Sequence, residues 1–238
     1  MGNSFFHFKK FSIQQQRSAM KVCTDSCLFG SLLPSGKHIH TALDIGAGTG
    51  LLSLMYAQKN ETACIDAVEI NADAALEAGD NFSESIYKDR LQIICTNITD
   101  FAKKKSTAYD LIFSNPPFYK KDLKTGNESK DIAHHGNMLT LQELAQAIDP
   151  LLAKDGIACL LLPYHRKTES KTLFLNYQLH CYKEIHVKQT PRHQPFRVIQ
   201  FFSGKIRTTI TQEIIIKNTD DSYTDDFTRL LKDYYLYL

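Results

Sequence analysis

Two short segments of the sequence carry residues whose types and spacing suit the binding of a ligand and the presentation of an amine. The first is the glycine-rich run DIGAGTG at residues 44–50, in which Gly46, Gly48 and Gly50 alternate with other residues. Glycine has no β-carbon, so a ligand can approach the backbone of such a turn closely. The second segment is the run NPPF at residues 115–118. We expect both segments to border one site.

An acidic residue follows the glycine run at a spacing that suits a nucleoside. Glu69 lies at the end of the apolar run ACIDAVEI, roughly 20 residues after the glycines, where an acidic side chain can accept hydrogen bonds from both hydroxyls of a ribose. Leu51 stands where a dinucleotide-binding fingerprint has its third glycine, which disfavours a nicotinamide or flavin ligand. The glycine run and the acid therefore indicate a ligand that contains adenosine. Asp44, across the same turn, could bind an amine or cap the following helix.

The NPPF run predicts a rigid turn that offers hydrogen-bond acceptors. Pro116 and Pro117 cannot continue a strand, so the chain leaves the preceding strand abruptly. The side-chain oxygen of Asn115 and the carbonyl of Pro116 are two acceptors, which match the two donors of an NH2 group such as the exocyclic amine of a base. Phe118 offers a flat face on which that base can stack, worth ~1–3 kcal/mol. Such a base has to be unstacked first, which favours a loop or a single strand.

Apolar runs that alternate with amphipathic segments predict the elements that position these residues. Seven runs have the character of strands: TALDIG, ACIDAVEI, LQIICT, YDLIFSN, GIACLLLP, FRVIQFFS and IRTTITQEIIIKN. Helices are predicted for residues 51–59, 72–85, 139–153, 166–177 and 224–238. Asn71 could cap the second helix, and Thr140 with Glu143 resembles a capping box for the third. This alternation predicts a doubly wound α/β domain with a mostly parallel sheet, in which ligands bind at the carboxyl ends of the strands.

The composition limits the classes of protein to which this chain can belong. It has 238 residues, 43% of them hydrophobic and 23% charged, which is enough apolar material for a sizeable core and excludes a disordered tail. The six cysteines lack the spacing of a zinc site or a disulfide framework, so we expect no metal. No apolar run has the length of a membrane span and no secretory signal begins the chain, which favours the cytoplasm and no membrane partner.

Local clusters of lysine and arginine have to attract any anionic partner, because the formal net charge is only +2. Lys9 and Lys10 lie in the leader, which we define as residues 1–40, and Lys120 and Lys121 follow the NPPF run. If both segments border one cleft, these lysines form a basic rim that would attract the phosphates of RNA. A second candidate group of RNA-binding cations comprises Lys188, Arg192, His193 and Arg197.

The glycine run, Glu69 and the NPPF run together resemble the class I S-adenosylmethionine-dependent methyltransferases that act on planar amino groups. The leader makes the resemblance more specific. Its segments FHFKKF and MKVCTD, followed by a Phe-Gly pair, are similar to the start of the tRNA1(Val) adenine-N6 methyltransferase family. The later segment AHHGNMLTLQEL resembles another part of that family, with His134 in place of an arginine. We expect Phe6, Phe8 and Phe11 to pack the leader onto the sheet, with base stacking as the alternative.

The resemblance implies a fold and a reaction. The fold would be a Rossmann-like, seven-stranded sheet in a single methyltransferase domain at residues 41–238, with the leader as an amino-terminal cap. S-adenosylmethionine would be the cofactor, and no metal would be needed. The enzyme would methylate the exocyclic N6 of an adenosine in RNA, and tRNA1(Val) beside the anticodon is the implied target.

The resemblance also assigns roles to individual residues. For cofactor binding they are Lys21, Thr24, Asp44, Gly46, Gly48, Gly50, Glu69 and Asn97. For catalysis they are Asn115, Pro116, Pro117 and Phe118, and for the RNA they are Phe118, Tyr119, Lys120, Lys121, Lys9 and Lys10. Asn97 stands where the family usually has an aspartate beside the adenine of the cofactor, and Asp100 is a possible replacement.

Three other functions stay open. The NPPF run also resembles that of protein-glutamine N5-methyltransferases, whose acceptor is likewise a planar NH2 group, but the leader is too short for their helical amino-terminal domain. Adenine-N6 methylation of rRNA or DNA is a second alternative, although no DNA target-recognition domain is evident. A noncatalytic RNA-binding module is a third, and it would bind RNA without affinity for S-adenosylmethionine.

Overall fold

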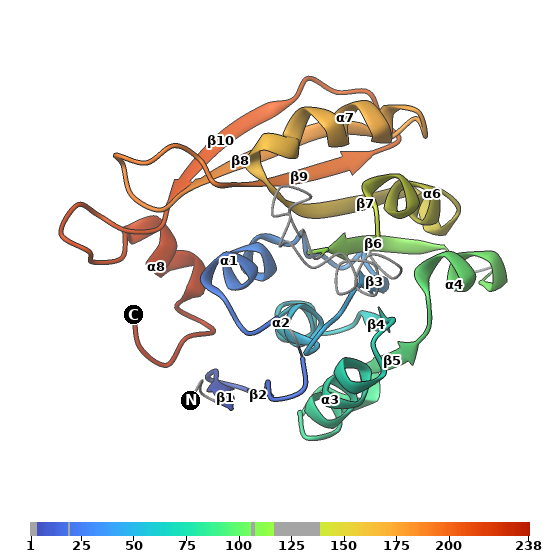
Figure 1. Ribbon diagram of the computed structural model, residues 1–238, viewed down its shortest axis with the longest axis horizontal. Helices are drawn as coiled ribbons and strands as arrows, with labels where there is room; N and C mark the ends of the chain where they lie inside the picture. The colour runs from blue at the N-terminus through green and yellow to red at the C-terminus, as the bar shows by residue number, and fades with distance from the viewer. Residues whose placement is uncertain (1–3, 19, 106–107, 117–138) are drawn as a thin grey trace, which may run out of the picture.

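A single large sheet forms the centre of the computed structural model, which describes residues 4–18, 20–105, 108–116 and 139–238 (Figure 1). Its strands are β3 (Thr41–Ile45), β4 (Cys64–Glu69), β5 (Leu91–Cys95), β6 (Tyr109–Ser114), β7 (Leu152–Pro163), β8 (His180–Lys188), β9 (Arg197–Ser203) and β10 (Ile210–Ile215). They lie in the order β10-β8-β9-β7-β6-β3-β4-β5. Only β9 pairs antiparallel with both of its neighbours, and every other pairing in this sheet is parallel. The predicted mostly parallel α/β architecture is confirmed.

The predicted number of seven strands was wrong, because the described residues already form eight strands in this sheet. The additional strand is β8, whose sequence HCYKEIHVK carries charged residues that do not suggest a buried strand. Its Glu184 is only 4% exposed, and its carboxylate is paired with Lys171 at 2.6 Å and with His186 at 3.0 Å. A buried charge is tolerated where it is paired, so the strand can lie inside the sheet in spite of its polarity.

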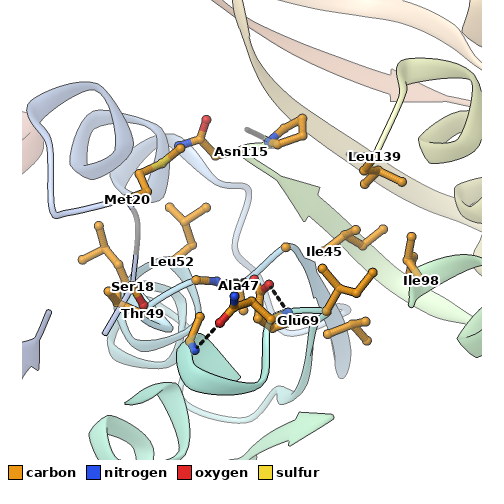
Figure 2. Close-up of a pocket in the computed structure, with 18 of the residues that line it drawn as sticks. Ser18, Met20, Ile45, Ala47, Thr49, Leu52, Glu69, Ile98, Asn115 and Leu139 are labelled. Atoms are coloured by element: carbon orange, nitrogen blue, oxygen red, sulfur yellow. Dashed lines mark hydrogen bonds between the residues drawn. The ribbon is translucent and has the colours of Figure 1, made fainter. Parts of the chain in front are cut away.

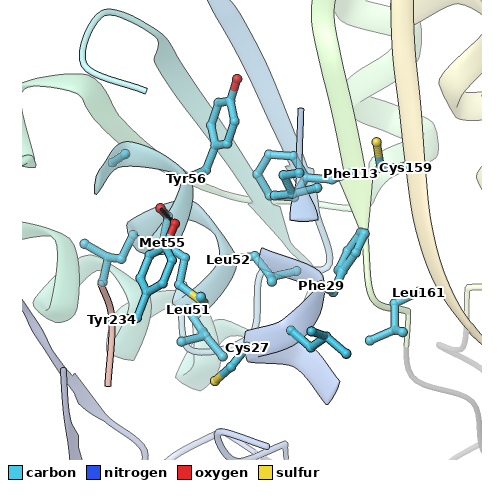
Figure 3. Packing of buried hydrophobic residues seen from close by; sticks show 14 of the residues in the cluster. Cys27, Phe29, Leu51, Leu52, Met55, Tyr56, Phe113, Cys159, Leu161 and Tyr234 are labelled. Atoms are coloured by element: carbon cyan, nitrogen blue, oxygen red, sulfur yellow. Dashed lines mark hydrogen bonds between the residues drawn. The ribbon is translucent and has the colours of Figure 1, made fainter. Parts of the chain in front are cut away.

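Two layers of helices cover the two faces of the sheet. The first face packs against α1 (Thr24–Leu32), α2 (Leu51–Lys59), α3 (Ala72–Ser83) and α8 (Asp225–Leu231). The second packs against α4 (Ile98–Lys104), α6 (Leu141–Leu151) and α7 (Lys167–Leu175). Short 3-10 helices, η1 (Lys88–Arg90) and η2 (Tyr164–Arg166), precede β5 and α7. Figure 3 shows part of the first layer, where the rings of Tyr56 and Phe113 lie 5.7 Å apart.

The predicted caps begin their helices as expected. The side chain of Asn71 accepts a hydrogen bond from Ala74 N at 2.9 Å, and Thr140 and Glu143 form the reciprocal bonds of a capping box. Helices α1 and α4 were not predicted. In α1, every residue from 26 to 31 is buried, so the sequence shows no polar face from which a helical period could be recognised.

The leader is folded onto the rest of the chain at its aromatic residues. Strands β1 (Phe5–His7) and β2 (Ser12–Gln14) pair antiparallel. Phe8 and Phe11 are buried and stack on each other at 4.6 Å, and the ring of Phe8 lies 5.9 Å from that of Tyr235. The expected packing role of the leader's aromatic residues is confirmed, although the direct ring partner comes from the carboxyl-terminal segment.

Two side chains of α3 hold the next part of the leader by its backbone. The buried carboxylate of Glu77 accepts hydrogen bonds from the N–H groups of Gln16, Arg17 and Ser18 at 2.5–2.8 Å. Burial acts to raise the pKa of Glu77, but these hydrogen bonds outweigh it, so that its pKa lies below the usual value. Asn81 both accepts from and donates to the backbone of Gln14. The leader therefore runs over α3 along a defined path.

None of the helices in the described part of the chain combines the length and the apolarity that crossing a membrane requires. Within the same residues, no group of three or more His, Cys, Asp or Glu side chains is placed to hold a metal ion.

Candidate active site

A cavity of about 600 Å³ opens at the carboxyl ends of β3, β4 and β6, and the leader forms one of its walls (Figure 2). Its volume lies within the range of small-molecule sites. The glycine turn after β3, the end of β4, the end of β6 and the start of α4 all contribute residues. Arg17, Ser18, Met20 and Lys21 of the leader and Ser26 of α1 close it from the other side.

The glycine turn presents bare backbone to this cavity. Gly46 and Gly48 have positive φ angles of 73° and 54°, which side chains rarely allow, and no atom lies within 4 Å of the position that a β-carbon would take on either residue. Gly50 has a different constraint: its φ is 78°, and a β-carbon there would collide with the ring of Phe82. Gly46 and Gly48 therefore form a cradle open to a ligand, while Gly50 permits close packing of α2 against α3.

Glu69 is fixed by two main-chain donors at the floor of the cavity. Its Oε2 accepts a hydrogen bond from Gly48 N and its Oε1 accepts one from Asn71 N, both at 2.9 Å. The residue is 9% exposed and lines the cavity. A carboxylate oxygen can accept more than one hydrogen bond, so both oxygens keep acceptor capacity for a ligand. This geometry suits the two neighbouring hydroxyls of a ribose.

Asp44 lies behind the glycine turn and does not line the cavity. It is completely buried: its Oδ2 accepts a hydrogen bond from Ser53 Oγ at 2.7 Å, and its Oδ1 has no partner among the described residues. Burial raises the pKa of Asp44 to about 7; the Ser53 hydrogen bond opposes this rise and the charge of Glu69 adds to it. The role of cofactor ligand thus stays a prediction for Asp44, whose observed partner belongs to α2.

We expect Asp44→Asn to flatten the pH dependence of stability of the ligand-free protein. An unfolded aspartate ionises near 3.8 and the folded one near 7, so the unfolded state releases its proton first and stability falls as pH rises between these values. The fall should approach about 4 kcal/mol in the wild type, and the asparagine variant should lack it. Urea unfolding at a series of pH values measures the difference. Parallel curves for the two proteins would show that Asp44 does not titrate in this way.

Asn115 follows the end of β6 directly and lines the cavity together with Pro116. The end of the strand is fixed because Ser114 Oγ donates to Ile45 O at 2.7 Å. The side-chain Nδ2 of Asn115 donates to Ser26 Oγ at 2.9 Å and lies 3.6 Å from Met20 Sδ. Its Oδ1 accepts no hydrogen bond from another described residue. As far as the described residues go, this oxygen can therefore accept a hydrogen bond from a ligand in the cavity.

The structure brings together seven of the residues predicted for the site. Those that line the cavity are Lys21, Gly46, Gly48, Glu69, Asn97, Asn115 and Pro116. Thr24, Asp44, Gly50, Lys9 and Lys10 are described but do not line it. The Nζ of Lys9 instead donates to Lys232 O at 2.6 Å. Pro117, Phe118, Tyr119, Lys120, Lys121 and His134 lie outside the described residues.

Asn97 borders the cavity where the resemblance implies the adenine of the cofactor. Its Oδ1 caps α4 by accepting hydrogen bonds from Thr99 N and Thr99 Oγ1 at 2.8 and 2.9 Å. Its amide NH2 group is a donor, which could meet a ring nitrogen. Asp100, the possible replacement, is not among the lining residues and lies 3.4 Å from Lys103 Nζ. The geometry thus favours Asn97 over Asp100.

No sequence pattern predicts that several of the lining residues belong to the cavity. Ser26 and Met20 reach the cavity only because the leader folds back over the sheet, and Ile98 and Leu139 supply apolar wall from two elements far apart in the chain. Nothing local distinguishes such residues from ordinary core residues. Only the similarity of the leader to a known family could have drawn attention to the segment that contains Met20 and Ser26.

Comparisons with known proteins agree with this geometry. A family model for the methyltransferase small domain matches residues 18–143. A tRNA1(Val) (adenine(37)-N6)-methyltransferase of Cytophaga hutchinsonii is 40% identical, with all of both chains covered. One of Flavobacterium psychrophilum is 38% identical, over 97% of this chain and 99% of that protein.

A solved structure resembles the fold at low sequence identity. It is a predicted O-methyltransferase from Agrobacterium tumefaciens, with a TM-score of 0.68 and 14% identity over 88% of this chain and 96% of that chain. The family resemblance of the sequence is confirmed by the two relatives. The chain therefore belongs to the methyltransferase small domain family and, within it, to the tRNA1(Val) (adenine(37)-N6)-methyltransferase family.

Proposed function

We propose that this protein transfers a methyl group from S-adenosylmethionine to the N6 amine of adenine 37 in tRNA1(Val). The observation that carries the proposal is one cavity in which a glycine cradle and Glu69 lie beside Asn115, whose amide oxygen has no donor among the described residues. The names of relatives that match over their whole length support the choice of substrate. A tRNA substrate would favour a cytoplasmic location for the enzyme. Residues 41–238 would form the catalytic domain, and the leader would cap it.

The residues of the cavity fit the methyl donor. Gly46 and Gly48 leave space against the backbone for its amino-acid part, and Glu69 offers two oxygens to its ribose hydroxyls. Ile98 and Asn97, at the start of α4, border the region that suits an adenine ring, one by apolar contact and the other by its amide. Lys21, exposed at the mouth, could pair with a carboxylate. When bound, S-adenosylmethionine supplies a methyl group on a positively charged sulfur.

The chain's own residues present the acceptor amine. Asn115 Oδ1 and the carbonyl oxygen of Pro116 would accept the two hydrogens of the adenine N6 amine, which draws the nitrogen lone pair out of conjugation with the ring. The lone pair is then directed at the methyl group, and the enzyme contributes alignment and exclusion of water. The displaced proton can leave after transfer, so we assign no general base. Pro117 would stiffen the turn, and Phe118 and Tyr119 would stack on the base.

The decisive test uses RNA that lacks the modification. Purified protein, labelled S-adenosylmethionine and total RNA from a strain without the gene should yield labelled N6-methyladenosine, detected by nucleoside mass spectrometry in the tRNA1(Val) fraction. Label at another RNA position would mean a different target nucleotide. Label on glutamine in a parallel reaction with total protein of that strain would mean a different class of substrate. RNA binding without affinity for S-adenosylmethionine would leave only a binding module.

A basic turn provides a further surface for the tRNA. Strand β8 runs in the same direction as β7. The turn at residues 189–196 follows β8, so it lies at the carboxyl ends of the strands, where the cavity also opens. There Tyr164 N, at the end of β7, donates to Phe196 O at 3.1 Å. Arg192 is exposed on this turn and could meet a phosphate.

We expect Arg192→Ala to weaken tRNA binding and to reduce the slope of log affinity against log salt by about 1, the amount for one lost phosphate contact. The matched control is Lys104→Ala. Lys104 is exposed at the end of α4, which leads to the amino end of β6 and so away from the end of the sheet where the cavity opens. Filter binding at several salt concentrations measures both. Equal slopes for Arg192→Ala and wild type would exclude the turn from the RNA path.

A further inference from the structure

We propose that Ser26 of the leader is a positioning residue for methyl transfer. It fixes the side-chain amide of Asn115 so that the amide oxygen points toward the amine that receives the methyl group. The inference rests on the proposed function, since it assigns the step that Ser26 supports. Ser26 is 4% exposed and lines the cavity from α1, a helix distant in sequence from the NPPF run.

The leader engages the donor side of the Asn115 amide. One contact is the 2.9 Å hydrogen bond from Nδ2 to Ser26 Oγ, and the other is the 3.6 Å contact from Nδ2 to Met20 Sδ. Figure 2 shows Met20 directly beside the nitrogen end of this amide. An amide nitrogen has two hydrogens, so these two partners account for both of them. Among the described residues, none donates a hydrogen bond to the oxygen of this side chain.

Orientation matters here because the two ends of an asparagine amide have almost the same shape and opposite hydrogen-bonding character. An adenine N6 amine brings two donors. If the amide of Asn115 were turned by half a rotation, its NH2 group would face another NH2 group and the acceptor would point into the leader. Ser26 opposes this rotation. When its hydroxyl donates its own hydrogen to Cys23 Sγ, 2.9 Å away, it can only accept at Asn115, so it binds Nδ2 and not Oδ1.

Ser26 is itself held in place by its own helix. Its Oγ lies 2.9 Å from Cys23 Sγ, one turn earlier. Burial, with a smaller effect from Asp25, raises the pKa of the Cys23 thiol to about 11, so the thiol stays neutral and can exchange a hydrogen bond with the serine. The start of α1 is also tied to β9, because Arg197 Nε donates to Asp25 Oδ2 at 2.7 Å. The hydroxyl therefore has little freedom to leave Asn115.

The test compares two buried serines of the same helix. Ser26→Ala should lower kcat about tenfold and leave the affinity for S-adenosylmethionine, measured by calorimetry, within about twofold. The control is Ser31→Ala, because Ser31 is 6% exposed and its Oγ donates to Leu28 O at 2.7 Å, away from the cavity. Its kcat should equal that of wild type. An unchanged kcat in Ser26→Ala would overturn the proposal.

A spectroscopic measurement separates positioning from general loss of structure. The side-chain amide protons of Asn115, assigned by their disappearance in Asn115→Ala, should exchange with water faster in Ser26→Ala than in wild type or in Ser31→Ala. A lower kcat with unchanged exchange would overturn the proposal. If wild type methylated no adenine at all, the proposed function would fail, and the exchange data would still decide whether Ser26 holds the amide.

Discussion

Replacing Asn115 with alanine should reduce methyl transfer about 100- to 1000-fold and leave the affinity for S-adenosylmethionine almost unchanged. The variant removes the acceptor oxygen that the cavity offers to the amine, while the glycine turn and Glu69, which would bind the donor, lie on other strands. A loss of this size is typical when a fixed group that stabilises the transition state is deleted.

Single-turnover rates with tRNA and calorimetry with S-adenosylmethionine would measure the two effects separately. Asn115→Asp is the informative companion, because it keeps an acceptor oxygen at the same place. We expect its rate to lie well above that of the alanine variant. If Asn115→Ala transferred methyl groups at the wild-type rate, the amine would have to be bound elsewhere.

Glu69→Ala should weaken S-adenosylmethionine binding about 100- to 10,000-fold. Hydrogen bonds to a charged acceptor contribute ~1.5–3 kcal/mol each, and the carboxylate would accept two from the ribose. The variant also releases Gly48 N and Asn71 N, which now both donate to this carboxylate, so the glycine cradle loses its connection to the start of α3.

Calorimetric titration gives the dissociation constants directly. Glu61→Ala is a suitable control, because Glu61 is an exposed carboxylate near the start of β4, at the opposite end of that strand from Glu69. It should bind the donor as wild type does. A Glu69→Ala protein that kept wild-type affinity would mean that the ribose lies in another part of the cavity.

The parts of the site that the sequence predicts are those whose geometry is local. Gly46 and Gly48 have positive φ angles within one turn, and Glu69 ends the very next strand, so chain spacing alone places them near one another. Asn115 follows β6, which is the other neighbour of β3, and the rule that ligands gather at carboxyl ends of parallel strands covers it as well.

The parts of the fold and of the site that the sequence does not predict depend on contacts between distant segments. Helix α1 is buried all round, and its Ser26 meets Asn115 only through the folded leader. Strand β8 contains Glu184, whose charge is acceptable only because Lys171 and His186 approach it in the folded chain. Such pairings have no signature in the spacing of residues along one element.

The leader's anchorage also sets an order of events during translation. Phe8 packs against Tyr235, and Lys9 N donates to Tyr234 O at 2.8 Å. These partners emerge from the ribosome long after the leader itself and after all the strands of the sheet. A nascent chain thus has to keep its first residues unanchored at these contacts until residues 234 and 235 have left the ribosome, whereas the hydrogen bonds of Glu77 to the leader can form as soon as α3 is available.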